Sequence, residues 1–301
     1  MRKIKVYHVD AFTSEPFGGN AAGIVPDAKE LSMEEMQKIA RELNLSETAF
    51  ILPTQDSKAD FRIRYFTPTN EIDFCGHATV GLSWLLATEY EWGERADRVV
   101  LETYIGLVPV EWNKEEGRLK GVVMTQVPPK IREDFFDIHL IAEWVGVSVE
   151  DIDSRYPIKC AHTGNWHLLV PIKNQEAIDQ ASPKLSELEA MNREKNIVTT
   201  HLFTFDTKEE GYDLYTRDFA PAVGIAEDPV TGSANGALAG YLVLEGFLNR
   251  HQAHTLKIAQ GHTVGRPGTL EVSISPGDKE PVIKVGGAAV VTIEGMLTLP
   301  N

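Results

Sequence analysis

The sequence predicts an α+β protein built from two similar halves, each with strands arranged around an apolar helix. Three short motifs of the first half recur in the same order in the second half, separated by roughly 150 residues. Segments rich in β-branched and aromatic side chains, bounded by Gly, Pro or polar turns, dominate both halves. Two longer apolar segments, 76–89 and 232–246, follow the third motif of each half; the first is apolar on almost every side, which is typical of a buried helix.

The repeated motifs are a Gly-Asn pair before a short strand, a Phe-X-Pro turn, and a small polar residue before the apolar helix. Three matches in register indicate duplication of one unit. We expect lobes at residues 1–118 and 119–287, and a terminal strand, 288–301, that either stays in the second lobe or returns to the first. The motif pairs are Gly19–Pro26 with Gly164–Pro171, Phe66–Pro68 with Phe219–Pro221, and Cys75–Ala78 with Thr231–Ala234.

The first lobe begins with a strand and alternates strands with two helices. Ser32 and Glu35 have the spacing of a capping box and precede apolar residues at helical period. Gly106 marks the turn between two neighbouring strands. The predicted strands are 3–12, 21–25, 48–52, 59–66, 99–105 and 108–112, and the second helix is 76–89; a further strand, 119–126, follows the expected lobe boundary.

The second lobe repeats this plan. Residues 127–130, Val-Pro-Pro-Lys, are the most linker-like stretch of the chain, and the alternative boundary lies earlier, near Gly117. A helix is expected near 138–145 and another at 232–246. The predicted strands are 166–171, 201–205, 256–260, 269–275, 282–285 and 290–299.

Composition is that of a globular protein that is not secreted. The 301 residues are 43% hydrophobic and 24% charged, no segment approaches the roughly 18 apolar residues of a membrane span, and no apolar run follows the first basic residues as in a signal peptide. The two cysteines, Cys75 and Cys160, do not make a disulfide framework, so we expect a reducing cytoplasm. The net charge of −15 argues against nucleic acid and anionic membranes as partners.

The two expected helix starts are the first candidate binding features. Unpaired N–H groups at a helix N-terminus attract a carboxylate or a developing enolate, and Gly76 and Gly232 stand where these groups emerge. The positive end of a helix also disfavours imidazolium, so we expect His77 to be a neutral donor or proton shuttle. The alternative is that His77, like Thr231 and Ser233 in the second motif, only caps its helix.

Glu47 is the candidate general base. It stands between a helix and an apolar strand, and a carboxylate in a dry interior has a raised pKa, as a base that works near neutral pH requires. The alternative is a solvated loop glutamate. His162 and His167 flank the second Gly-Asn motif and are expected to be structural.

Several motifs together resemble the PhzF-like isomerases of phenazine biosynthesis. The resemblance covers nearly the whole chain and implies the diaminopimelate-epimerase-like fold, with two similar lobes, each a curved sheet around a central helix, and the active site between them. The matching segments are Asp10–Thr13, Pro16–Asn20, Ser46–Phe50, Tyr65–Pro68, Cys75–Thr79, Asp228–Ala234 and Gly265–Gly268.

The resemblance also implies an activity. The family's phenazine enzyme isomerises trans-2,3-dihydro-3-hydroxyanthranilate without a cofactor, a glutamate shifting a proton between ring carbons. Transferred by motif, Glu47 is the acid/base and His77, Asp228 and Ser233 are its polar partners. The resemblance further implies a homodimer. The two helix starts favour a small anionic metabolite as substrate, and no metal or nucleotide motif is present in the sequence. The substrate-binding residues expected are Asn20, Cys75, Gly76, Thr231 and Gly232.

One departure from the related epimerases bears on the chemistry. Those enzymes use two cysteines as a base and acid pair, whereas here Cys75 fills the first position and Thr231 the second. A threonine hydroxyl is too weakly acidic to take the second role, so Cys75 is interpreted as a small buried residue. An isomerase is therefore the leading hypothesis. The alternatives are an amino-acid or hydroxy-acid epimerase, and a binding protein that has lost turnover.

Overall fold

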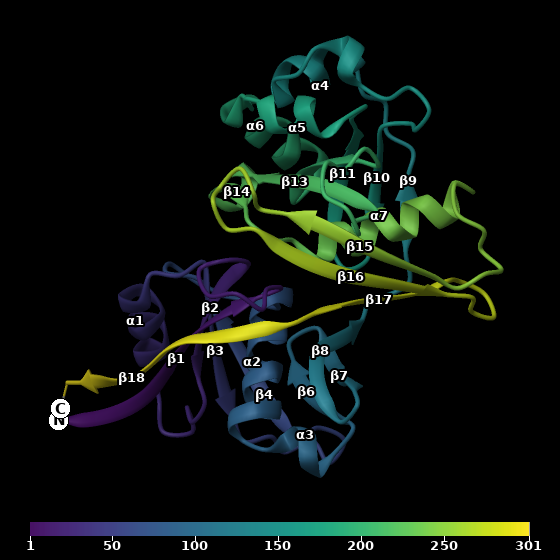
Figure 1. The fold of residues 1–301 in the computed structure, drawn as a ribbon. Coiled ribbons are helices and arrows are strands. Elements are labelled where there is room, and N and C mark those ends of the chain that lie inside the picture. Colours follow the sequence, from purple (N-terminus) through teal and green to yellow (C-terminus); the bar gives the residue numbers. More distant parts are fainter. Residues whose placement is uncertain (301) are drawn as a thin grey trace. The chain divides into compact units, whose positions relative to one another are not determined.

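The chain folds into two compact units in the computed structural model, which describes residues 1–300. Unit 1 comprises Met1–Thr125 and the segment from Gly286 to the C-terminus, and unit 2 comprises Gln126–Val285. The last strand, β18 (Ala289–Leu299), belongs to unit 1 because it pairs antiparallel with β1 (Arg2–Ala11). In Figure 1 β18 runs along β1 near the chain ends.

Unit 1 has a mixed sheet. β1 pairs antiparallel with β2, β2 parallel with β3, and β3 antiparallel with β4. β4 pairs antiparallel with β5 and parallel with β6. β6 pairs antiparallel with β7, and β7 pairs antiparallel with β8. The bounds are β2 (Asn20–Val25), β3 (Glu47–Leu52), β4 (Phe61–Phe66), β5 (Glu71–Ile72), β6 (Arg98–Thr103), β7 (Gly106–Glu115) and β8 (Arg118–Thr125).

Unit 2 has the same pairing pattern. β9 lies on β10 as β18 lies on β1, and the pairs from β10–β11 to β15–β16 have the same directions as β1–β2 to β6–β7. Two pseudo-symmetric lobes were predicted, and this pattern confirms them. The bounds are β9 (Lys130–Arg132), β10 (Lys159–His162), β11 (Trp166–Pro171), β12 (Thr199–Thr204), β13 (Leu214–Ala220), β14 (Ile225–Asp228), β15 (His254–Gln260) and β16 (Gly268–Ser275). β17 (Val282–Gly287) begins in unit 2, and its last two residues belong to unit 1.

Each unit holds one apolar central helix. α2 (Gly76–Glu89) contacts β1, β2, β3 and β8, and α7 (Gly232–Leu244) contacts β9, β10, β11 and β16. Most residues of both helices are buried, as expected for a helix that is apolar on all sides. Within each unit of Figure 1 the central helix lies against the strands of its own sheet.

Shorter helices cover the other face of each sheet. α1 (Met33–Leu43) begins with the predicted capping box of Ser32 and Glu35 and buries Met36 and Ile39 in unit 1. In unit 2 the covering helices are α4 (Ile138–Val145), α5 (Gln175–Gln180) and α6 (Leu185–Lys195), of which only α4 was predicted; α3 (Trp92–Arg95) follows α2 in unit 1. No helix within residues 1–300 has the length and apolar composition that a bilayer crossing requires.

β13 is a strand that was not predicted from the sequence. All its side chains are buried although Arg217 and Asp218 stand at its centre. Arg217 faces the covering helices, where it pairs with Glu227 at 2.8 Å and donates to the carbonyl of Ile178. Asp218 faces the other side and accepts from His201 at 2.8 Å. These partners explain how a strand with two central charges is stable in the interior.

Candidate functional site

The first turn of α2 is open toward its N-terminus. Cys75 is the N-cap residue, with extended backbone angles and no side-chain hydrogen bond to the helix start. The Cys75 carbonyl accepts a hydrogen bond from the Thr79 hydroxyl at 2.6 Å. The Thr79 hydroxyl in turn lies 2.7 Å from the Tyr65 hydroxyl. The start of α2 thus has no side-chain cap on its backbone N–H groups, an arrangement that can bind an anion.

Gly76 keeps this helix start uncovered. A Cβ atom added there would come no closer than 3.9 Å to any other atom, the terminal methyl of Met124. The fold thus does not require glycine at this position. By contrast, Gly19 has a φ of +56°, and its added Cβ would lie 2.0 Å from the carbonyl oxygen of Ala11, so the turn before Asn20 does require it.

Glu47, the first residue of β3, lies beside this helix start. Oε2 of Glu47 is 3.2 Å from Nε2 of His77, and both side chains are only about a tenth exposed. Nε2 also lies 3.4 Å from the Ser46 hydroxyl and 3.8 Å from Sγ of Cys75. Three predicted site residues, Glu47, His77 and Cys75, are therefore in contact, although about 30 residues separate Glu47 from the other two.

The charges of this pair differ from the expectation. Burial favours neutral Glu47, but the positive charge of His77 and hydrogen bonds from His77, Ser46 and Cys75 lower the pKa of Glu47 below its ordinary value. Burial likewise opposes imidazolium, but the Cys75 and Glu47 groups hold the pKa of His77 well above 6.5. These directions contradict the predicted raised pKa of Glu47 and neutral His77, because the charges and hydrogen bonds of the neighbouring groups together outweigh burial.

Cys75 stays protonated. Burial and the negative charge of Glu47 both raise the pKa of its thiol, and the opposing influence of His77 is weaker. Glu47 is therefore the anionic partner of His77 at neutral pH. Both cysteines of the chain are free thiols, in different units.

In unit 2 the matching helix start has a polar framework. Thr231 is the N-cap residue of α7, and its hydroxyl donates to Oδ2 of Asp228 at 2.5 Å. Gln260, fully buried at the end of β15, connects both residues: its amide nitrogen donates to the Asp228 carbonyl and its amide oxygen accepts from the Thr231 N–H. The Asn235 amide donates to the same Gln260 oxygen at 2.8 Å. Asp228 and Thr231, two predicted site residues, are thus fixed against each other.

Gln260 and Ser46 are site residues that the sequence did not reveal. Gln260 is one polar residue at the end of an apolar strand, with no motif around it, and only the fold places it beneath α7. Ser46 lies in the matching motif, but nothing in that motif distinguishes it from its neighbours.

Gly232, Ser233 and Asn20 are the remaining predicted residues. Gly232 and Ser233 form the first turn of α7, both partly exposed, and the Ser233 carbonyl accepts from the Thr163 hydroxyl. Asn20 is the first residue of β2 and is buried opposite Ala11 of β1. Its counterpart in the repeat, Asn165, is exposed.

His167 is structural, as expected. It is fully buried, its Nδ1 lies 2.8 Å from the Thr199 hydroxyl, and burial lowers its pKa to about 4. The Thr199 hydroxyl donates a hydrogen bond to Asp218, and Asp218 also accepts one from His201. This polar cluster is completely enclosed within unit 2, where no substrate reaches it.

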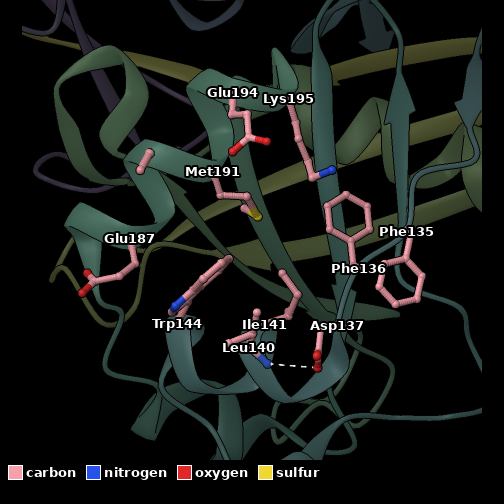
Figure 2. A pocket seen from close by; sticks show the side chains of 11 residues that line it. Phe135, Phe136, Asp137, Leu140, Ile141, Trp144, Glu187, Met191, Glu194 and Lys195 are labelled. Carbon is pink, nitrogen blue, oxygen red and sulfur yellow. Dashed lines mark hydrogen bonds between the residues drawn. The ribbon is translucent and has the colours of Figure 1, made fainter.

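A groove of about 390 Å³ lies elsewhere on unit 2, between α4 and α6. Figure 2 shows Phe136, Trp144 and Met191 around it. None of the predicted site residues lines this groove, and its walls are mostly apolar, so it has no visible part in proton transfer.

Comparisons with known proteins identify the family. The model of the phenazine biosynthesis-like protein family, PhzC-PhzF, matches residues 9–295. An uncharacterized isomerase of Clostridium acetobutylicum is 35% identical over 303 residues, covering 99% of each chain. The trans-2,3-dihydro-3-hydroxyanthranilate isomerase of Pseudomonas aeruginosa is 32% identical over 293 residues, covering 95% of this chain and 96% of the relative.

Solved structures agree. A PhzF-family protein of Bacillus anthracis has a TM-score of 0.90 and 33% identity, covering 99% of this chain and all of the other. A hydroxyproline epimerase of Agrobacterium vitis has the same fold at 14% identity, with a TM-score of 0.65 over 100% of this chain and 94% of its own. The expected epimerase-like fold is therefore confirmed, and the chain belongs to the phenazine biosynthesis-like, or PhzF, family.

Proposed function

We propose that this protein is an isomerase that needs no cofactor and shifts a proton within a small carboxylate-bearing substrate. The observation that carries the proposal is the contact between Glu47 and His77 beside the open start of α2. It combines an ionised carboxylate, which can accept a proton, with backbone donors, which can hold the negative charge that deprotonation creates.

The proposed chemistry conserves all atoms of the substrate. The Glu47 carboxylate removes a proton from carbon, and the electron pair of the broken C–H bond moves into an adjacent conjugated system. The resulting anion is stabilised by the N–H groups at the start of α2. Glu47, now a neutral acid, returns the proton to a different carbon, so that the double bond moves and no redox partner is required.

The ion pair limits how strong a base Glu47 is. A lowered pKa keeps the carboxylate ionised but weakens its hold on a proton. Protonation of Glu47 also leaves His77 without its anionic partner, which favours return of the proton to the substrate. We therefore propose a substrate whose C–H bond is already acidified by a neighbouring carbonyl, imine or diene.

We propose that unit 2 takes part in the reaction through the start of α7, where Asp228 and Ser233 bind the substrate. The hydrogen bond between Thr231 and Asp228 and the Gln260 framework support this role, because they hold Asp228 in a fixed position at the helix start. The named activity of the P. aeruginosa relative makes trans-2,3-dihydro-3-hydroxyanthranilate the first compound to examine.

An epimerase that uses two thiols has less support. Thr231 stands where such an enzyme needs its second cysteine, and the raised pKa of Cys75 leaves little thiolate at neutral pH. Replacement of Cys75 by alanine separates the two mechanisms: an isomerase based on Glu47 retains turnover, whereas a thiol-based epimerase loses it.

Solvent exchange tests the proposal. The protein is incubated in D₂O with trans-2,3-dihydro-3-hydroxyanthranilate and with a panel of small unsaturated or amino carboxylates, and the products are followed by NMR. We expect migration of a double bond in at least one compound, with deuterium entering at the carbon that receives the proton. Inversion at a stereocentre without double-bond migration would favour the epimerase, and binding without exchange would favour a protein that has lost turnover.

A further inference from the structure

We propose that Glu47, Cys75 and His77 also form a binding site for Zn²⁺, and that the bound ion inhibits the protein by occupying its acid/base pair. The metal-binding part of this inference depends only on the three side chains. The inhibition part rests on the proposed function.

The three side chains supply three different donor atoms in a small volume. A carboxylate oxygen of Glu47, Sγ of Cys75 and a ring nitrogen of His77 all lie within 4.8 Å of one another. In a tetrahedral zinc site, ligand atoms at normal bond lengths are about 3.4–3.6 Å apart. Here Oε2 to Nε2 is 3.2 Å and Sγ to Nε2 is 3.8 Å, differences that side-chain rotation can remove.

The donor set is one that zinc prefers. Thiolate, imidazole and carboxylate are its usual protein ligands, and three of them leave a fourth position for water. Oε2 of Glu47 already lies 3.2 Å from Nε2 of His77, so an ion between them would exchange this contact for two metal bonds. Elsewhere in residues 1–300 no three histidine, cysteine or carboxylate side chains converge in this way.

The three side chains are partly exposed to solvent, and their charges can balance that of the ion. All three side chains are mostly buried but each retains some exposure, between 7% and 12%. On coordination, Cys75 loses its thiol proton and His77 its extra proton, and both pass to solvent. Glu47 and the Cys75 thiolate then bring two negative charges to the doubly charged ion. The same exchange removes the base and its cationic partner, so turnover stops while the ion is bound.

Cobalt spectroscopy tests the binding. Co²⁺ is added to the full-length, metal-free protein under anaerobic conditions with a phosphine reductant. We expect a thiolate-to-cobalt charge-transfer band that saturates at one equivalent and disappears when Zn²⁺ is added. Cys75→Ser should lack the band. Cys160→Ser, which changes the other cysteine, is the matched control and should keep it, and Glu47→Gln should weaken binding at least about 10-fold.

A second measurement does not depend on a variant that folds. The native protein is alkylated with and without Zn²⁺, and the modified cysteine is identified by mass spectrometry. We expect Zn²⁺ to protect Cys75 and to leave the modification of Cys160 unchanged. Absence of the cobalt band, its loss in Cys160→Ser, or equal alkylation of Cys75 with and without zinc would each overturn the site.

Inhibition is measured separately, once a substrate is known. We expect Zn²⁺ to inhibit the wild-type protein reversibly and to inhibit Cys75→Ser at least about 10-fold more weakly. Binding without inhibition would overturn only the inhibitory role. Turnover that needs Zn²⁺ would instead contradict the proposed function and leave the binding site intact, so the two failures are distinguishable.

Discussion

Glu47→Gln should destabilise the protein by an amount that depends on pH in a specific direction. Two unit charges at 3.2 Å attract each other by about 5 kcal/mol at an effective dielectric constant of about 20. The cost of burying both charges opposes this attraction. Glutamine keeps the shape and one acceptor, so we expect the free energy of unfolding to fall by about 1–3 kcal/mol at pH 6.

The sign of the pH dependence follows from the two pKa shifts. The pKa of Glu47 is lowered, so its stabilisation is present above 4.5 and is lost as the pH falls through the lowered value. The pKa of His77 is raised, so its stabilisation is complete below 6.5 and is lost as the pH rises through the raised value. The difference between wild type and Glu47→Gln should therefore be largest between these limits and should shrink in alkaline solution.

Urea unfolding of both proteins between pH 5 and pH 9 measures this difference. Glu71→Gln is a matched control, because Glu71 is similarly buried in unit 1 and pairs with Arg64, which stays charged throughout this range. Its destabilisation should not decline with pH in the same way. A difference for Glu47→Gln that is constant or grows toward pH 9 would refute the ion pair, as would a His77 ring that titrates at the same pH in both proteins by NMR.

Two further predictions concern the helix starts, and a third concerns metal ions. Gly76→Ala should change the free energy of unfolding by no more than about 0.5 kcal/mol relative to wild type, since the added Cβ meets no atom closer than 3.9 Å. It should raise KM, because the new side chain covers the anion-binding turn. An unchanged KM would show that this turn does not bind the substrate. Gln260→Leu should lower the free energy of unfolding, measured by urea denaturation, by about 2–5 kcal/mol, because the Thr231 N–H and the Asn235 amide lose their acceptor. A loss below about 1 kcal/mol would contradict the structural role of Gln260. Treatment with a chelator should not lower turnover, and recovery of a lost activity by added zinc would exclude the proposed chemistry.

Local patterns in the sequence predicted local structure well. The capping box of Ser32 and Glu35 forms as expected, and both central helices begin at the predicted glycines. These features depend on side chains a few residues apart, so the chain segment itself contains the information. The same holds for the structural role of His167, a single histidine within an apolar strand.

Features that depend on distant residues were not predictable in this way. The pKa directions of Glu47 and His77 reverse because the fold brings together two groups 30 residues apart, whose attraction cannot be inferred from either neighbourhood. β13 was not among the predicted strands, and its two central charges are stable there only because Arg217 and Asp218 pair with residues of other elements. Gln260 acquires its role only from the turn at the start of α7. In each case the decisive interaction is tertiary.

The measurement that tests the central claim most directly is solvent deuterium incorporation into the substrate by wild type, Glu47→Gln and the control Glu71→Gln. Proton transfer by Glu47 predicts a rate about 10²–10⁴-fold lower in Glu47→Gln, because the amide cannot accept the proton. The control should keep a rate close to that of wild type, and all three proteins should be folded by circular dichroism. Deuterium incorporation by folded Glu47→Gln at the wild-type rate would contradict the account, because another group would then have to be the base.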